Sequence, residues 1–208
     1  MVKKPAFALT LAVSFLSVGM AFFRTFYTQD FTYSYMPINL ALAWIPFLLS
    51  LTIRTLMKQG KRFLSCVLGV FWLFFYPNTF YLITDYIHLR LRPPIPMWFD
   101  ALMLTLFAVL GAVLGFASLY LIARLLKKYL NEYLLTAAIL TVASFGVYIG
   151  RFLRWNSWDI IFRPDSLFAD VIASLHQPLA VVFTLGSSVV LVSLYWMVRS
   201  LLRSVFDR

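Results

Sequence analysis

The sequence is short of charge, and of acidic charge most of all. Only 12% of its 208 residues are charged and 62% are hydrophobic, whereas about a quarter of the residues in soluble proteins carry charge. Its 8 acidic residues stand against 18 basic ones. A composition this apolar excludes an ordinary soluble domain and predicts a protein embedded in a membrane.

Cysteine and histidine are equally scarce. The single Cys66 excludes an intramolecular disulfide, and His88 and His176 are the only two histidines. Three common catalytic patterns are missing from the sequence: G-x-S-x-G, H-E-x-x-H and the phosphate-binding glycine loop. We therefore predict neither a metal site nor a bound cofactor.

Long uncharged runs are what the chain does contain. A helix needs roughly 20 apolar residues to cross the hydrocarbon core, and continuous runs of that kind favour helices over any other spanning structure. The spacers between the runs are too short for a separate soluble domain. The predicted fold is all-α: residues 1–208 form a single multi-pass membrane domain, a bundle of about six transmembrane helices. The predicted helices cover residues 5–23, 37–53, 63–84 with a break at 77, 101–123, 133–150 and 178–198.

The positions of the basic residues predict the orientation of the bundle. With the amino terminus in the cytoplasm, 12 of the 18 basic residues fall on the inner side and 6 on the outer side. This bias follows the positive-inside rule and favours cytoplasmic termini and contact with membrane lipids. Nucleic acid is not an expected partner, because no basic domain extends into solution. The six outer basic residues are Arg24, Arg90, Arg92, Arg151, Arg154 and Arg163.

The third run, which contains FFYPNTFYLITDYIHLR at residues 74–90, is too long to be a simple span. A straight helix from Phe63 to Leu89 would be about 40 Å long, against a hydrocarbon core of roughly 30 Å. Pro77 predicts the break, because proline lacks the backbone N–H that continues a helix. The side chain of Asn78 then either satisfies freed backbone groups or binds a ligand.

Three residues beyond or opposite this break are candidates for acid–base chemistry. Asp85 and His88 are three residues apart and share a face if the helix continues. Such a pair can exchange protons or provide two metal ligands, but two ligands do not make a metal site. Asp100, near the start of the next helix, should lie at the same depth as Asp85. It either interacts with the helix dipole or shares a proton with Asp85.

The segment GRFLRWNSWD, residues 150–159, places arginine directly after an uncharged span. Arginine at that depth needs a carboxylate, a phosphate or a carbonyl as a partner. One interpretation is an internal ion pair with Asp85, Asp100 or Asp159. The other is an anion-binding site for a lipid phosphate or lipid-linked sugar phosphate. The binding candidates are Asn78, Arg151, Arg154, Trp155, Asn156, Trp158 and Asp159.

Two further patterns predict packing. In the fourth run, Gly111 and Gly115 form a G-x-x-x-G pair, which lets a neighbouring helix of the same bundle approach closely. After Pro164, apolar residues recur at helical spacing, with Asp165 or Ser166 as the expected N-cap. This second pattern predicts a short amphipathic interfacial helix on the outer face.

Three blocks together resemble a known family. PNTFYLITD at residues 77–85, WFD at 98–100 and GRFLRWNSWD at 150–159 are similar to the signature blocks of a bacterial integral-membrane family. That family is catalogued as domain of unknown function 1361. The resemblance implies a bacterial multi-pass protein in the cytoplasmic membrane, and it implies no particular activity.

Three functions remain open from the sequence. The first is a non-enzymatic protein whose outer polar cluster binds an anionic headgroup, a small anion or a partner. The second is a small enzyme acting on a lipid or lipid-linked phosphate at the outer leaflet, with Asp85, His88 and Asp100 moving protons. The third is a transporter, which the apolar mid-membrane positions disfavour. The sequence gives no indication of the oligomeric state.

Overall fold

The fold is described from a computed structural model for residues 4–156 and 159–206. Six helical stretches are long and apolar enough to cross a membrane, which confirms the predicted all-α membrane fold. Within the described ranges there is no β-strand, and residues 92 and 95 form an isolated bridge. The helices are α1 (Lys4–Thr28), η1 (Phe31–Tyr33), α2 (Met36–Lys58), α3 (Arg62–Phe75), α4 (Asn78–Thr84), η2 (Asp85–His88), α5 (Met97–Leu126), α6 (Glu132–Phe152), α7 (Asp159–Phe162), α8 (Pro164–Ser174) and α9 (Pro178–Phe206).

Most spanning helices extend beyond the uncharged runs in the sequence at both ends. α1 continues through Arg24 to Thr28, and α5 begins at Met97 and ends at Leu126. Because helices continue into charged residues, charge is a poor marker of a helix end. The third span consists of α3, α4 and η2, with its break at Tyr76 and Pro77.

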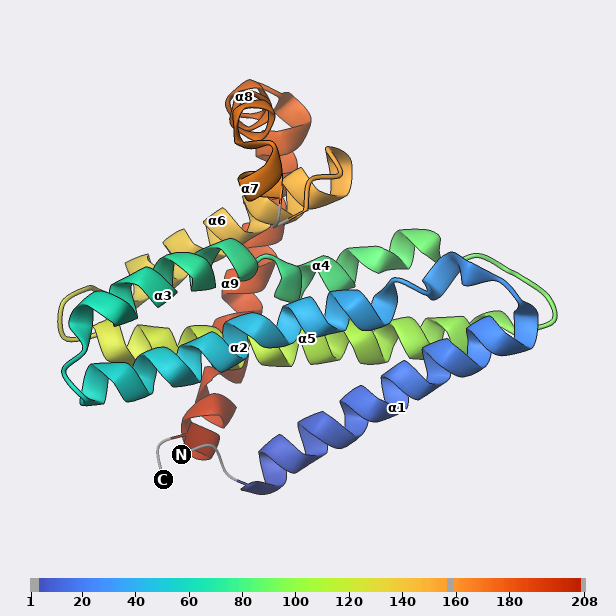
Figure 1. Cartoon of the computed structure of the whole chain (residues 1–208), viewed down its shortest axis with the longest axis horizontal. Coiled ribbons are helices and arrows are strands. Elements are labelled where there is room, and N and C mark those ends of the chain that lie inside the picture. The colour runs from blue at the N-terminus through green and yellow to red at the C-terminus, as the bar shows by residue number, and fades with distance from the viewer. Residues whose placement is uncertain (1–3, 157–158, 207–208) are drawn as a thin grey trace.

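The helices surround α5. Figure 1 shows α2 and α5 lying side by side through the middle of the molecule, with α3 and α4 following one another along them. α1 runs obliquely beside α5, and α9 crosses the other helices steeply while packing on α6. More than half of α5 is buried, which is the pattern of a helix that is apolar all round and packed on several sides.

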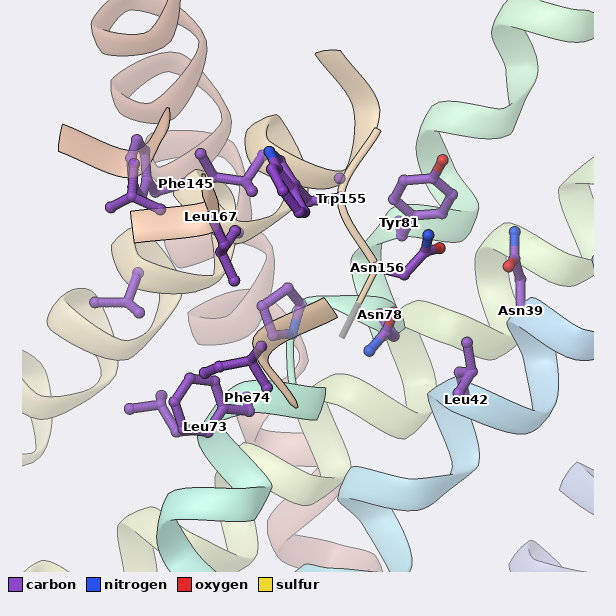
Figure 2. A pocket seen from close by; sticks show the side chains of 17 residues that line it. Asn39, Leu42, Leu73, Phe74, Asn78, Tyr81, Phe145, Trp155, Asn156 and Leu167 are labelled. Atoms are coloured by element: carbon purple, nitrogen blue, oxygen red, sulfur yellow. The ribbon is translucent and has the colours of Figure 1, made fainter. Parts of the chain in front are cut away.

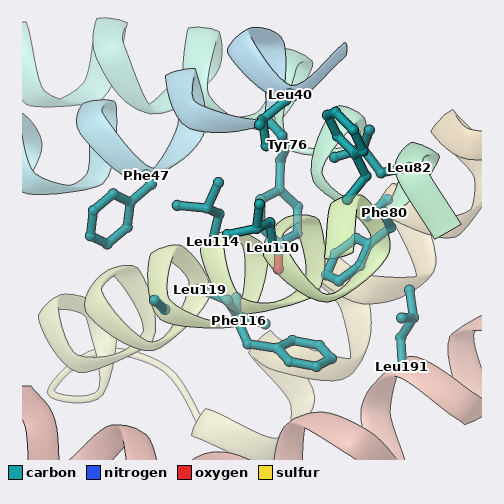
Figure 3. Close-up of a cluster of buried hydrophobic side chains, with 14 of the residues drawn as sticks. Leu40, Phe47, Tyr76, Phe80, Leu82, Leu110, Leu114, Phe116, Leu119 and Leu191 are labelled. Carbon is teal, nitrogen blue, oxygen red and sulfur yellow. The ribbon is translucent and has the colours of Figure 1, made fainter. Parts of the chain in front are cut away.

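The main core is a layer of side chains around α5. Figure 3 shows Tyr76 and Phe80 from the broken span meeting Leu110 and Leu114 of α5. Polar groups join the same layer: the Trp72 Nε1 donates to Ser118 Oγ at 2.7 Å, and Ser118 Oγ donates to the Pro46 carbonyl at 2.9 Å. This chain of hydrogen bonds ties α3, α5 and α2 together inside the bundle.

The break at Pro77 is closed by its polar neighbours. The Asn78 side-chain amide donates to the Phe75 carbonyl at 2.9 Å, and the Thr79 hydroxyl donates to the Tyr76 carbonyl at 2.8 Å. α4 then continues in the same span as a separate helix of seven residues. Asn78 therefore does satisfy a freed backbone group.

The glycine pair of α5 makes room for α4. A Cβ added at Gly111 would overlap the Thr79 carbonyl oxygen, and one added at Gly115 would lie 2.6 Å from the Thr79 hydroxyl oxygen. The predicted close approach is thus made within the chain, between α5 and the broken span. When two helix backbones lie this close together, the helices gain contact area in a lipid environment.

The helix after Pro164 forms as predicted, but its cap differs. α8 has Arg163 as its N-cap and Pro164 as its first residue, so it starts before Asp165 and Ser166. Proline favours the first helical position because its missing N–H would be unpaired there anyway. Of its apolar residues, Leu167 and Val171 pack inward and Phe168, Ile172 and Leu175 are exposed.

At the opposite end of the bundle a charged pair holds α9 to α6. Arg199 donates to both carboxylate oxygens of Glu132, at 2.8 Å and 2.6 Å. The rings of Tyr133 and Trp196 stack beside this pair with centroids 4.2 Å apart. A two-pronged arginine–carboxylate contact fixes both distance and orientation between the helices.

The approach of α4 to α5 can be tested at its glycines. Gly111→Ala should lower the free energy of unfolding by about 1–3 kcal/mol, because the added methyl group overpacks the contact with Thr79. Gly19→Ala is the matched control, since nothing lies within 4 Å of a Cβ at Gly19. Thermal unfolding in detergent measures both variants. Equal midpoints for the two would contradict the proposed contact.

Candidate functional site

One buried charge pair joins the broken third span to the end of α6. The Arg151 guanidinium pairs with the Asp85 carboxylate, and its Nε donates to Thr84 Oγ1 at 2.8 Å. It also lies 3.3 Å from the His88 Nε2 and over the ring of Tyr81, 4.2 Å from the centroid. Asp85 is fully buried and the Arg151 side chain is 11% exposed. Arg151 is thus paired with Asp85, one of the three carboxylates that were its predicted partners.

The pair leaves some polar groups without partners. The second oxygen of Asp85 and the hydroxyl of Tyr35 are both buried, and neither has a hydrogen-bond partner among residues 4–156 and 159–206. Asp85 and His88 do lie together, through their shared contact with Arg151. A guanidinium already placed between them opposes a metal cation in the same position.

A second buried arginine was not singled out in the sequence. Arg24 is fully buried in α1, and its guanidinium contacts Asp100 at 3.2 Å and Asp30 at 2.9 Å. It also lies over the ring of Tyr33, 4.9 Å from the centroid. The residues on both sides of Arg24 are uncharged and mostly aromatic through Tyr27, and that continuity is the signal from which its position inside the helix could have been predicted.

Asp100 therefore has a partner of its own. Asp85 pairs with Arg151, whereas Asp100 pairs with Arg24, and no hydrogen bond joins the two carboxylates in the described part of the chain. Asp30 completes this second cluster, and it also accepts from Arg92 at 3.3 Å. A hydrogen bond from the Thr32 hydroxyl, together with Arg24, holds the pKa of the Asp30 carboxyl well below its usual value.

The segment after α6 is stabilised by its own contacts. Trp155 Nε1 donates to Asp170 at 2.8 Å, and the backbone N–H of Asn156 donates to Asp159 at 2.7 Å. That backbone bond, assisted by Arg163, lowers the pKa of the Asp159 carboxyl. Trp158 lies outside the described residues.

Arg154 differs from Arg151 in every respect that matters for a site. It is exposed, its backbone has a left-handed φ of 61°, and no side-chain ion pair involves it within the described ranges. The two arginines therefore do not form one anion-binding unit: Arg151 points into the bundle interior and has a carboxylate, whereas Arg154 lies at the surface.

A cavity of about 340 Å³ lies beside the break in the third span. Its size is at the lower end of the roughly 300–1,000 Å³ that is typical of small-molecule sites. α2, α3, α4 and α6 contribute to its wall, together with residues 155, 156, 160, 167 and 171. Tyr81 links it to the buried pair, because the Arg151 guanidinium covers the ring of Tyr81. The polar side chains that line the cavity belong to Asn39, Asn78, Tyr81, Trp155 and Asn156.

The lining changes from polar to apolar along the helices. In α2, Asn39 precedes Leu42 by one turn, and in the third span Leu73 and Phe74 precede Asn78. Figure 2 shows the amides of Asn39, Asn78 and Asn156 on one side, and Leu73 and Phe74 on another.

The apolar end of the cavity is not enclosed. Leu73, Phe74 and Val142 are 39%, 49% and 49% exposed, so their outer surfaces form part of the apolar face that the bundle presents to its surroundings. In a bilayer, that face is in contact with acyl chains. The apolar end of the cavity thus lies at the lipid-facing surface of the bundle.

The spanning helices and the buried charge pairs define a multi-pass membrane protein whose polar end carries a cavity. Residues 38–194 match the family described as protein of unknown function (DUF1361). The match covers most of the chain, so the protein belongs to this family, and it includes all three blocks on which the resemblance was based. No curated protein and no solved structure matches the chain.

The buried pair should behave as one energetic unit. Asp85→Ala or Arg151→Ala alone should lower the free energy of unfolding by about 3–5 kcal/mol, because each leaves a buried charge unpaired. The double variant should lose clearly less free energy of unfolding than the two single variants lose in total. The measurement is a double-mutant cycle of unfolding in detergent.

Arg154→Ala provides the matched control, since Arg154 lies three residues further along and is exposed. It should change stability by less than about 0.5 kcal/mol. Strict additivity of the Asp85 and Arg151 effects would show that the two side chains do not stabilise one another.

Proposed function

We propose that the protein binds the headgroup of a membrane lipid in the cavity beside Pro77. The observation that supports this most directly is the change in polarity of the lining side chains from one end of the cavity to the other. Amide and hydroxyl groups lie at one end, and at the other end are apolar side chains whose outer surfaces are exposed. A site with that gradient suits an amphiphile, because the headgroup finds hydrogen-bond partners while the tail stays in the bilayer.

The buried charge pair has a supporting role in this proposal. Arg151 holds α6 against η2 and covers the ring of Tyr81, which is part of the cavity wall. Pro77 holds the other side, because it packs directly on Gly146 of α6. The wall is thus built from rigid contacts, which lowers the entropic cost of binding.

Filling the cavity should remove the bound lipid. Val142→Trp places a large ring in the cavity wall, whereas Val109→Trp places the same ring on an exposed position of α5 that does not line it. Mass spectrometry of lipids that co-purify with each variant should show one lipid class depleted from Val142→Trp alone. If wild type and both variants have identical lipid profiles, the proposal is wrong.

We further propose that the chain lies in a bacterial cytoplasmic membrane with both termini in the cytoplasm. The positive-inside count supports this orientation, which puts the cavity at the outer face. A cysteine at Ser166 should then react with a membrane-impermeant reagent added to intact cells, and one at Gly60 should not. Both are made after Cys66→Ser, because Cys66 is itself exposed. Labelling at Gly60 from outside would invert the orientation.

A further inference from the structure

We infer that the headgroup in this cavity is uncharged and rich in hydroxyl groups, as in a glycosyl diacylglycerol. This inference rests on the proposed function and names the class of lipid. It starts from the charge of the wall: none of the cavity-lining residues is charged. The two residues between the described ranges, Ser157 and Trp158, carry no charge either.

Two arginines that cover lining residues are already neutralised. Arg151, over Tyr81, is paired with Asp85, and Arg163, over Trp155, is paired with Asp159 at 3.1 Å. Arg154 has no ion pair among the described residues, but it lies at the surface and does not line the cavity. An anionic headgroup inside the cavity would have to displace Asp85 to gain Arg151, which is costly because a buried carboxylate is left without a cation.

Three of the five polar side chains in the wall already donate to the protein itself. The Asn78 amide donates to the Phe75 carbonyl, and Trp155 Nε1 donates to Asp170. The Asn156 amide donates to Asp159, more weakly, at 3.4 Å. A phosphate or carboxylate accepts hydrogen bonds and donates none, so these three side chains have fewer donors left for an anion.

Acceptors, in contrast, are in excess. Pro46 has no N–H for the Leu42 carbonyl, and Pro77 has none for the Leu73 carbonyl, so each lacks its usual helical donor. Both leucines line the cavity, Leu42 one turn beyond Asn39 and Leu73 one turn before the break, so their carbonyls lie between the amides and the apolar end. Hydroxyl groups can donate to such carbonyls and accept from amides, which makes a sugar headgroup the better match.

The test compares three lipids with identical dioleoyl chains: monoglucosyl diacylglycerol, phosphatidylglycerol and phosphatidylethanolamine. Each is titrated into the detergent-solubilised full chain and followed by native mass spectrometry. The glucolipid should bind at least about tenfold more tightly than either phospholipid, a difference of ~1.4 kcal/mol. Asn156→Ala should reduce this preference severalfold. The control Thr52→Ala, at an exposed position toward the far end of α2, should not.

Equal or tighter binding of either phospholipid would overturn the inference while leaving the proposed function intact. Saturable binding of none of the three lipids by folded wild-type protein would overturn both. Asn39→Ala provides a second variant with the same expected effect, in case Asn156→Ala does not fold. An unchanged glucolipid preference in a folded Asn39→Ala or Asn156→Ala variant would also count against the inference.

Discussion

A helix broken inside a membrane has to satisfy its freed backbone groups without water, and the third span does so with its own side chains, packed against α5. Asn78 and Thr79 donate to the carbonyls just before the break. Gly111 and Gly115 then let α4 pack closely enough to exclude lipid from that region. The contact between α4 and α5 positions α4. It thereby also places Tyr81 in the cavity wall and Asp85 beside Arg151.

The charges at the polar end join helices that are far apart in the sequence. Arg24 reaches Asp100 across 76 residues, and Arg151 reaches Asp85 across 66. In hydrocarbon an unpaired charge is expensive, so each pair strongly favours one arrangement of its two helices. Arg24 and Arg151, two of the predicted outer basic residues, are thus in specific pairs that hold α1 to α5 and η2 to α6.

The fold was largely predictable, and the site was predictable only in part. Continuous apolar runs indicate spans, and Pro77 locates the break, because both depend on local chemistry. Arg24 was assigned to a loop, since its partners become visible only when α1 and α5 are packed. Asn39 was missed for a similar reason: nothing in a single run shows which face of α2 turns toward α6. The sequence did not distinguish the largely buried Arg151 from the exposed Arg154, because the difference depends on where α6 ends.

The gradient along the cavity also has a direction with respect to the bilayer. Leu73 precedes Asn78 within the third span, so along the helix axes the amides lie nearer the end of the bundle that carries Arg151 and Asp85, and Leu73 and Phe74 lie nearer its middle. Under the proposed lipid binding, a headgroup would therefore enter from the leaflet at that end. A chemically identical lipid in the opposite leaflet would present its tail where Asn39, Asn78 and Asn156 lie. Occupancy of the cavity would therefore depend on how a lipid is distributed between the two leaflets as well as on its total amount.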